Sequence, residues 1–544
     1  MGRMLKWLAL GLLGLALVAA FQPWTLWDDG LRSGLAAQIR RDTGLAMTGG
    51  RTVFSLLPRP RLKIEDVTIA DPANGVLIEA QSLKGDIGLA SLLGGHLVFQ
   101  NAELLAPKIL VDADKILPAG PGSLAAIIPA RFAPSQIAVL RSLRLVSGQV
   151  RLRSVRLREI LVIDDISLDI DWPVASAPLV AAGQGQWQGQ HATFGIWISQ
   201  ADKLLQGGSS IVDFHAEKPD GAVNLRGDLT FGAHAVSMTG LNMRVGGADF
   251  EGALVLRDAE GRGLLTGTLA TNALDLAQVV PLIMAQLPRA MTDDGQWSQQ
   301  PFVAVPALAF DADLRLSAAS VDLGFLKLAD VALSLLARSG RIDIDLADAK
   351  GLGGTLKGRA GLSLPPQAVD ARVDGLATGI DLAKFCAATA CQHAMSGSLI
   401  LALSGQATGN SVSDMAATLR GNLQASASQG NIAGLDVEQA LRRMEKRPRD
   451  AQPDPRSGTI AFDKANASIT LAQGRAVLAD AQMTGAAAWL QLAGQVDVAG
   501  RNLALKGIAG QTGASESGPL LRFDLRGSWD TPELAFDLPV PAPG

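Results

Sequence analysis

Apolar and polar residues alternate with a period of two along most of the chain, from about residue 50 to its C-terminal end. Such alternation is typical of β-strands that have one apolar face and one face in water. Turn signals such as Asp220-Gly221 and Ser339-Gly340 recur along the chain, as many-stranded antiparallel sheets require. The pattern therefore predicts a mainly β protein of about 25–30 short strands. The clearest apolar positions of these runs are Val150, Leu152, Ile342, Ile344, Leu346, Leu399, Leu401, Leu403, Val496 and Val498.

Segments with a helical pattern are few. A short helix is expected after Asp28 and Asp29, and further helical segments are expected within 122–143, 276–287 and 435–450. The apolar segment 276–287 suits either a lid over an apolar groove or a plug at the end of a sheet. The basic residues of 435–450 suit either contact with anionic headgroups or a solvated helix face.

These helices are too few to cover the apolar faces of so many strands, yet a sheet must bury its apolar face against something. Two packed sheets in a closed sandwich would satisfy that requirement. A long antiparallel sheet curled on itself would also satisfy it, and would leave an apolar groove along its inside. Periodicity alone does not choose between the two, and a one-residue slip would reverse which side chains face inward.

The most apolar stretch of the chain lies at its N-terminal end. Residues 5–21 read LKWLALGLLGLALVAAF, and the positive charges at this end are Arg3 and Lys6. A membrane-spanning helix needs about 20 apolar residues, a length that the segment reaches only if Trp24 and Trp27 form an interfacial belt. The small residues Val18-Ala19-Ala20 would also suit a cleaved signal peptide. Both readings place the body of the chain across a membrane, and we expect the anchor, with a cytoplasmic N-terminus.

Composition narrows the class of ligand. The net charge is −4, so no large basic surface points to nucleic acid. Apolar residues make up 48% of the chain, but aromatic residues only 4%, and tyrosine is absent. An interior lined by medium-sized aliphatic side chains suits acyl chains better than a flat, specific ligand.

Candidate chemistry is sparse, which predicts a protein that is not an enzyme and needs no cofactor. The five histidines lie singly, and neither a G-x-S-x-G nor a G-x-x-x-x-G-K motif occurs. Cys386 and Cys391 are five residues apart, and in an exported chain we expect a local disulfide worth about 2 kcal/mol. A metal site that uses His393 would lack a second ligand pair.

Two groups of glycines, prolines and apolar residues resemble the AsmA family. The N-terminal group consists of Thr43, Gly44, Pro58, Pro60, Val67, Ile69, Leu92, Leu93, Gly94, Leu105 and Pro107. The C-terminal group consists of Leu419, Gly421, Gly430, Ile432, Gly434, Leu435, Asp436, Gly527, Trp529 and Pro532. Between about 170 and 390 the chain matches the family only in its spacing of apolar residues and turns.

This resemblance implies the groove rather than the sandwich. It implies a single N-terminal transmembrane helix in the bacterial inner membrane, a periplasmic β-groove with a few short capping helices, and conduction of phospholipids toward the outer membrane. The expected domains are an anchor (1–27), an N-terminal AsmA-like region (28–170), central groove repeats (171–390) and a C-terminal AsmA-like domain (391–544).

The expected partners are phospholipids, the inner membrane, and periplasmic or outer-membrane proteins. Two alternatives stay open. A non-conducting scaffold of the same fold could assist the assembly of outer-membrane proteins. A surface or secreted β-solenoid adhesin would instead have a cleaved N-terminus.

Overall fold

The computed structural model divides the chain into two compact units, Met1–Leu269 and Ala270–Gly544, and each unit is described by itself. The structure describes residues 24–26, 33–34, 36–37, 40, 46–57, 59–71, 75–88, 99–112, 141–154, 158–174, 176–219, 221–232, 235–259, 262–277, 289–302, 310–338, 340–363, 368–389, 391, 394–433, 458–513 and 520–537. These residues form 29 strands, as the alternating pattern predicts.

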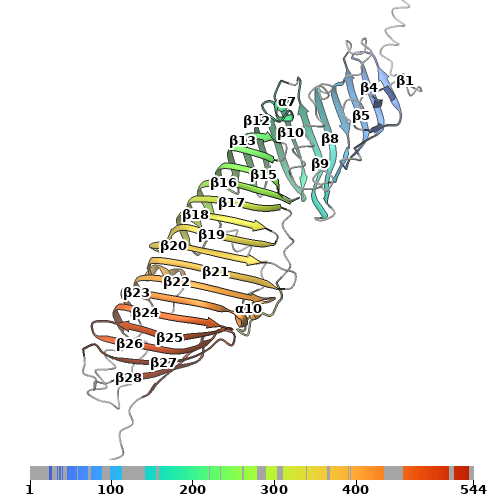
Figure 1. Cartoon of the computed structure of the whole chain (residues 1–544). Helices are drawn as coiled ribbons and strands as arrows, with labels where there is room; N and C mark the ends of the chain where they lie inside the picture. Colours follow the sequence, from blue (N-terminus) through green and yellow to red (C-terminus); the bar gives the residue numbers. More distant parts are fainter. Residues whose placement is uncertain are drawn as a thin grey trace, which may run out of the picture. The chain divides into compact units, whose positions relative to one another are not determined.

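The first unit is a twisted sheet with the short helix α7 (Ala201–Leu205) (Figure 1). Residues 33–34, 36–37 and 40 are also helical, as expected after Asp28 and Asp29. Its strands are β1 (Trp24–Leu26), β2 (Ala46–Thr48), β3 (Thr52–Ser55), β4 (Arg61–Asp71), β5 (Val76–Ile87), β6 (Phe99–Leu105), β7 (Lys108–Asp112), β8 (Ser142–Ser154), β9 (Arg158–Asp171), β10 (Leu179–Trp187), β11 (Gln190–Ile198), β12 (Ser209–Lys218), β13 (Gly221–Phe231), β14 (Ala235–Val245) and β15 (Ala248–Ala259). Strand β16 (Arg262–Asp275) runs through the division between the units.

Strand pairing in the first unit is antiparallel except at two strand pairs. From β8 onward each strand pairs with the next along the chain, as short turns allow. Strands β6 and β7 both pair with β8 in parallel. The sheet is therefore mixed, which corrects the expectation of a purely antiparallel sheet. Parallel neighbours need a crossover connection, and turn signals do not reveal one.

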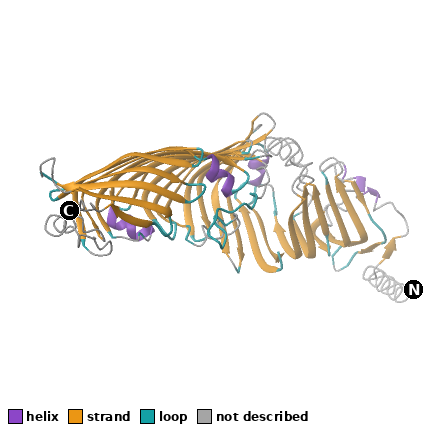
Figure 2. Cartoon of the chain, turned by 90° about the horizontal axis from the view of Figure 1, so that it is seen from below, coloured by secondary structure: helices purple, strands orange, loops and turns teal. Residues whose placement is uncertain are grey.

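The second unit is an antiparallel meander from β17 to β29. Its strands are β17 (Phe310–Asp322), β18 (Lys327–Arg338), β19 (Arg341–Gly351), β20 (Gly354–Ser363), β21 (Val369–Asp381), β22 (Met395–Gly409), β23 (Arg420–Ala433), β24 (Thr459–Ala472), β25 (Arg475–Thr484), β26 (Ala488–Asp497), β27 (Asn502–Gln511), β28 (Leu520–Ser528) and β29 (Glu533–Asp537). Its helices, α9 (Leu382–Thr389) and α10 (Val412–Thr418), are short pieces between strands (Figure 2).

Several strands carry a bulge in mid-strand, where one residue adopts a left-handed conformation. Asp330 has a φ of 51° and Gln429 a φ of 53°, and the pairing register shifts beside both residues. A bulge inserts an extra residue, bends the strand and increases its twist. Bulges also change which residues share a face, so strict alternation fails at these points.

The N-terminal anchor lies largely outside the described residues. Of the predicted segment 1–27, the structure describes Trp24–Leu26, which form β1 and pair with β3. The rest of that segment lies outside the described residues, so the anchor stays a prediction. None of the helices in the described ranges is long and apolar enough to cross a membrane. Most of 122–143 and 276–287, and all of 435–450, also lie outside the described residues.

Candidate functional site

One face of the second unit is apolar from strand to strand. Cross-strand partners share a face of a sheet, so the pairing register traces rows of side chains across it. One row consists of Leu316, Leu333, Leu346, Gly358, Gly375, Leu403, Leu423, Ile469, Leu478, Gly494, Leu505 and Leu525. The next row on this face consists of Leu314, Leu335, Ile344, Ala360, Val373, Gly405, Gly421, Leu471, Ala476, Val496, Leu503 and Gly527.

The opposite face of the same strands is mostly polar. The row that lies between the two apolar rows, but on the other face, consists of Arg315, Ser334, Asp345, Arg359, Asp374, Ser404, Asn422, Thr470, Val477, Gln495, Ala504 and Arg526. Arg359 donates to Asp345 at 2.6 Å on this face, and both side chains are exposed to water. The unit thus has one wet side and one aliphatic side.

The first unit has the same organisation. One apolar row consists of Leu62, Gly85, Ala102, Leu143, Ile170, Ala181, Ile196, Phe214, Leu225, Met243 and Phe250. Its neighbour consists of Ile64, Leu83, Leu104, Leu145, Leu168, Gly183, Phe194, Ala216, Val223, Val245 and Ala248. We call the faces that carry these rows the apolar face of each unit.

The apolar face of the second unit is only partly covered by the protein itself. Ile344 is 41% exposed, Val373 45% and Leu362 36%. Leu335 and Leu403 are half-buried rather than fully enclosed. In a closed sandwich these inward side chains would be buried, so in this part of the sheet the structure favours an uncovered apolar surface. Large exposed apolar surfaces mark binding sites.

The predicted groove positions fall on these faces, with one exception. Ile344 and Val496 lie in one row of the second unit, and Leu346 and Leu403 in the other. Val498 follows β26 in a turn, where its backbone N–H donates to Gly474 at 2.8 Å. Neighbouring rows take in the remaining positions, Ile342, Leu399, Leu401, Val150 and Leu152. Contact of these residues with lipid stays a prediction.

A segment that the sequence patterns did not reveal lies across strand ends of the second unit. We call residues 289–302 the strap. Trp297 Nε1 donates to the carbonyl of Val498 at 2.8 Å, although 201 residues separate them. Further along the strap, the Phe302 N–H donates to the carbonyl of Asn410 at 2.8 Å. The strap therefore joins the β26–β27 turn to the end of β22.

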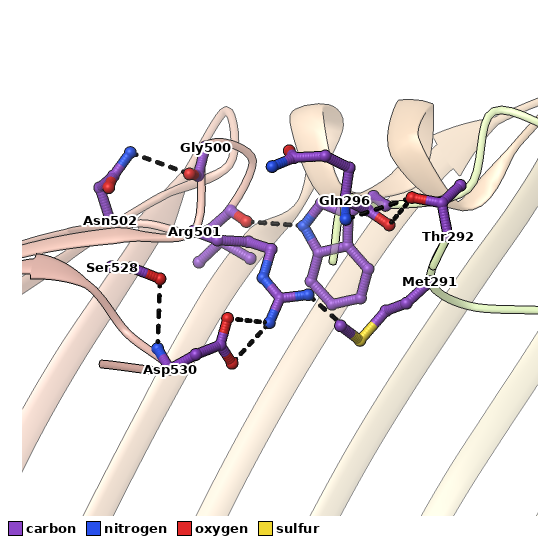
Figure 3. Close-up of polar contacts among 10 residues, drawn as sticks. Met291, Thr292, Gln296, Gly500, Arg501, Asn502, Ser528 and Asp530 are labelled. Carbon is purple, nitrogen blue, oxygen red and sulfur yellow. Dashed lines mark hydrogen bonds and ion pairs between the residues drawn. The ribbon is translucent and has the colours of Figure 1, made fainter. Parts of the chain in front are cut away.

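A buried arginine fastens the strap (Figure 3). Arg501 is only 5% exposed, and its guanidinium lies over Trp297 and Trp529, 5.5 and 5.0 Å from the ring centroids. Its Nη2 donates to both carboxylate oxygens of Asp530, at 2.7 and 2.6 Å. Its Nη1 lies 3.1 Å from the sulfur of Met291. Aromatic faces, a carboxylate and a thioether thus surround one cation.

Comparison with known protein families identifies the family of the chain. A model of the AsmA family matches residues 135–481, which is more than half of the chain. The chain belongs to the AsmA family. The match includes the C-terminal residues Leu419 to Asp436 and the central strands, where the sequence showed only a common rhythm. It begins after the N-terminal group Thr43–Pro107. No curated protein matches the chain.

AsmA-family membership implies an envelope protein of the bridge-like lipid-transfer kind. The apolar faces agree with that class, because they present aliphatic side chains in continuous rows. Members are generally transport proteins rather than enzymes. Among the described residues of this AsmA-family chain, no group of three His, Cys, Asp or Glu side chains is placed to hold a metal ion.

The two cysteines lie together beside α9. Cys386 is buried, and the Cys391 N–H donates to the Cys386 carbonyl at 3.2 Å. Burial raises the pKa of the Cys386 thiol, and its hydrogen bond with Cys391 raises it further. Hydrogen bonds with Cys386 and Thr389 lower the pKa of Cys391. The disulfide between them stays a prediction.

Proposed function

We propose that this AsmA-family protein holds the acyl chains of phospholipids on its apolar faces and carries them through the periplasm toward the outer membrane. The observation that supports the proposal is the partly exposed apolar row of the second unit. Ile344 and Val373 stand 41% and 45% exposed in it, opposite a charged face. A soluble monomer rarely leaves so continuous an apolar surface in water.

Burial energetics support the same ligand class. Moving one methylene group out of water is worth about 0.8 kcal/mol, so a two-tailed lipid crossing water unprotected faces a large cost. An aliphatic surface removes most of that cost without binding the lipid at one fixed position. Glycines within the rows, such as Gly358 and Gly375, keep the surface smooth along the direction of movement.

Attachment to the inner membrane is part of the proposal. It rests on the N-terminal apolar segment and on Arg3 and Lys6, which would keep the N-terminus in the cytoplasm. In that arrangement the body lies in the periplasm and the inner membrane supplies the lipid. Periplasmic or outer-membrane proteins would accept the lipid from this protein. Nucleic acid has no role.

A matched pair of substitutions on β21 tests the proposal. Val373 and Leu376 are both 45% exposed, but the register places Val373 in the apolar row and Leu376 on the opposite face, beside Lys357. Because the two positions are equally exposed, an aspartate costs folding a similar amount at each. Transfer of a fluorescent phospholipid between vesicles is measured for the V373D and L376D proteins.

We expect V373D to lower lipid binding and transfer at least tenfold, because a carboxylate in the row must lose water whenever a tail passes. L376D should retain the wild-type rate. Equal rates for both variants and the wild type, in protein that unfolds at the wild-type temperature, would overturn the proposal.

A further inference from the structure

The apolar face of the first unit changes from closed to open along a single row. At its beginning, Ile64 is 0% exposed, Leu83 6%, Leu104 4% and Leu145 5%. Phe194 and Ala216, further along the same row, are half-buried. Val223 and Val245 are then 36% and 38% exposed. All of these residues are linked by backbone pairing. Val223 and Val245 lie near the ends of β13 and β14, but Leu104 lies near the end of β6 and is buried, so position along a strand does not by itself explain the difference.

The neighbouring row shows the same trend. Leu62 is 1% exposed and Ala102 6%, whereas Phe214, Leu225 and Met243 are half-buried. In the later part of the unit the short helix α7 contacts β12 and β13, and Val212 is buried nearby. Leu241 on β14 and Ala248 on β15 are buried on this face as well, at 1% and 7% exposed. Covering there is therefore local, while both rows are enclosed over β4–β6.

Side chains of the protein itself fill the closed section. Met47 on β2 and Val67 on β4 belong to one buried cluster with Leu62, Ile64 and Leu83, and Ala36 and Phe54 pack against it. Protein interiors are packed as densely as organic crystals, with few voids larger than a water molecule. An acyl chain therefore finds no room over β4–β6 unless this cluster comes apart.

We propose that β2–β6 form a plug, and that acyl chains bind only beyond it, on the open section that includes Phe194, Phe214, Val223, Met243 and Val245. Lipid enters this section from the open side of the sheet and does not thread in from the N-terminal end. The inference rests on the proposed function, and it names where along the first unit the lipid-binding surface begins.

The size of the open surface suits this ligand. Strands lie about 4.8 Å apart, so the five strands β11–β15 span about 19 Å across their axes. The hydrocarbon of one bilayer leaflet is about 15 Å thick, half of a 30 Å core. The tails of one phospholipid can thus lie across these strands without reaching the plug.

Photolabelling of the wild-type, full-length protein tests the inference. A phospholipid with a diazirine in its acyl chain is loaded from vesicles, the sample is irradiated, and the labelled peptides are identified by mass spectrometry. A small water-soluble diazirine, used in parallel on the same preparation, labels the wet faces of all strands. The labelling by this second probe shows which peptides the mass spectrometer detects poorly, and the lipid labelling is corrected for that difference.

We expect lipid adducts on peptides of β11–β15 and of β19–β21, where Ile344 and Val373 are exposed, and at least tenfold less labelling on β4 and β5. Comparable labelling of β4 and β5 would overturn the plug and leave the proposed function standing. The absence of lipid adducts on both units would contradict the proposed function itself, and the plug with it.

Discussion

Arg501 lies over the rings of Trp297 and Trp529, which meet edge to face with their centroids 5.9 Å apart. Trp297 belongs to the strap, Arg501 to the β26–β27 turn, and Trp529 follows β28. One cation thus connects three segments of the second unit. The arrangement sets where the strap lies along the strand ends.

Replacing Arg501 by alanine should lower the free energy of unfolding of the second unit by about 2–4 kcal/mol. Two cation–π contacts and the charge-assisted hydrogen bonds to Asp530 are lost together. Urea denaturation, followed by tryptophan fluorescence, measures the change. In R526A the lost partner is Asp524; the Arg526 side chain is 62% exposed and that of Asp524 33%, so that variant should lose less than about 1 kcal/mol. Equal losses would mean that Arg501 does not fasten the strap.

A substitution of Gly507 should be poorly tolerated because an aromatic ring covers it. A Cβ atom at this position would lie 2.0 Å from the ring of Phe523 on β28. G507A should therefore displace the ring and cost about 1–3 kcal/mol, as overpacking does. At Gly405, on the same face, the nearest atom would be Val373 Cγ1 at 3.4 Å. If G405A proved as destabilising as G507A in thermal unfolding, ring contact would not be the cause.

The reduced protein should react with iodoacetamide at Cys391 before Cys386. The thiolate is the reactive form, and hydrogen bonds with Cys386 and Thr389 lower the pKa of Cys391. At neutral pH more of Cys391 is therefore ionised than of an ordinary cysteine. The T389V variant removes one of the two hydrogen bonds and should move the midpoint of the rate–pH profile upward. An unchanged midpoint would exclude a role for Thr389.

The alternating pattern predicted the strand content, and within each unit most of the apolar positions that it singled out share a face. It could not predict the bulges. Leu328 and Val331 pack in one core cluster although they are three positions apart, because Asp330 between them adopts a φ of 51°. Strict alternation would place these two side chains on opposite faces. The choice of a left-handed residue depends on the neighbouring strands, which a single strand does not reveal.

The strap and the plug were beyond sequence reasoning for another reason. Trp297 and Arg501 are 204 positions apart, and neither lies in a local motif. Ile64 and Val223 both occupy apolar positions of alternating strands, yet one is 0% and the other 36% exposed. That difference is set by what packs against each strand. Alternation shows which side of a strand is apolar, but not what covers it.

The amount of phospholipid carried by the protein itself is the most direct measure of the central claim. The full-length protein would be extracted in a mild detergent, and its bound lipid quantified by mass spectrometry. We predict at least one phospholipid per chain, and less in V373D than in L376D. Folded wild-type protein that carries no phospholipid would contradict the claim that its apolar faces hold acyl chains.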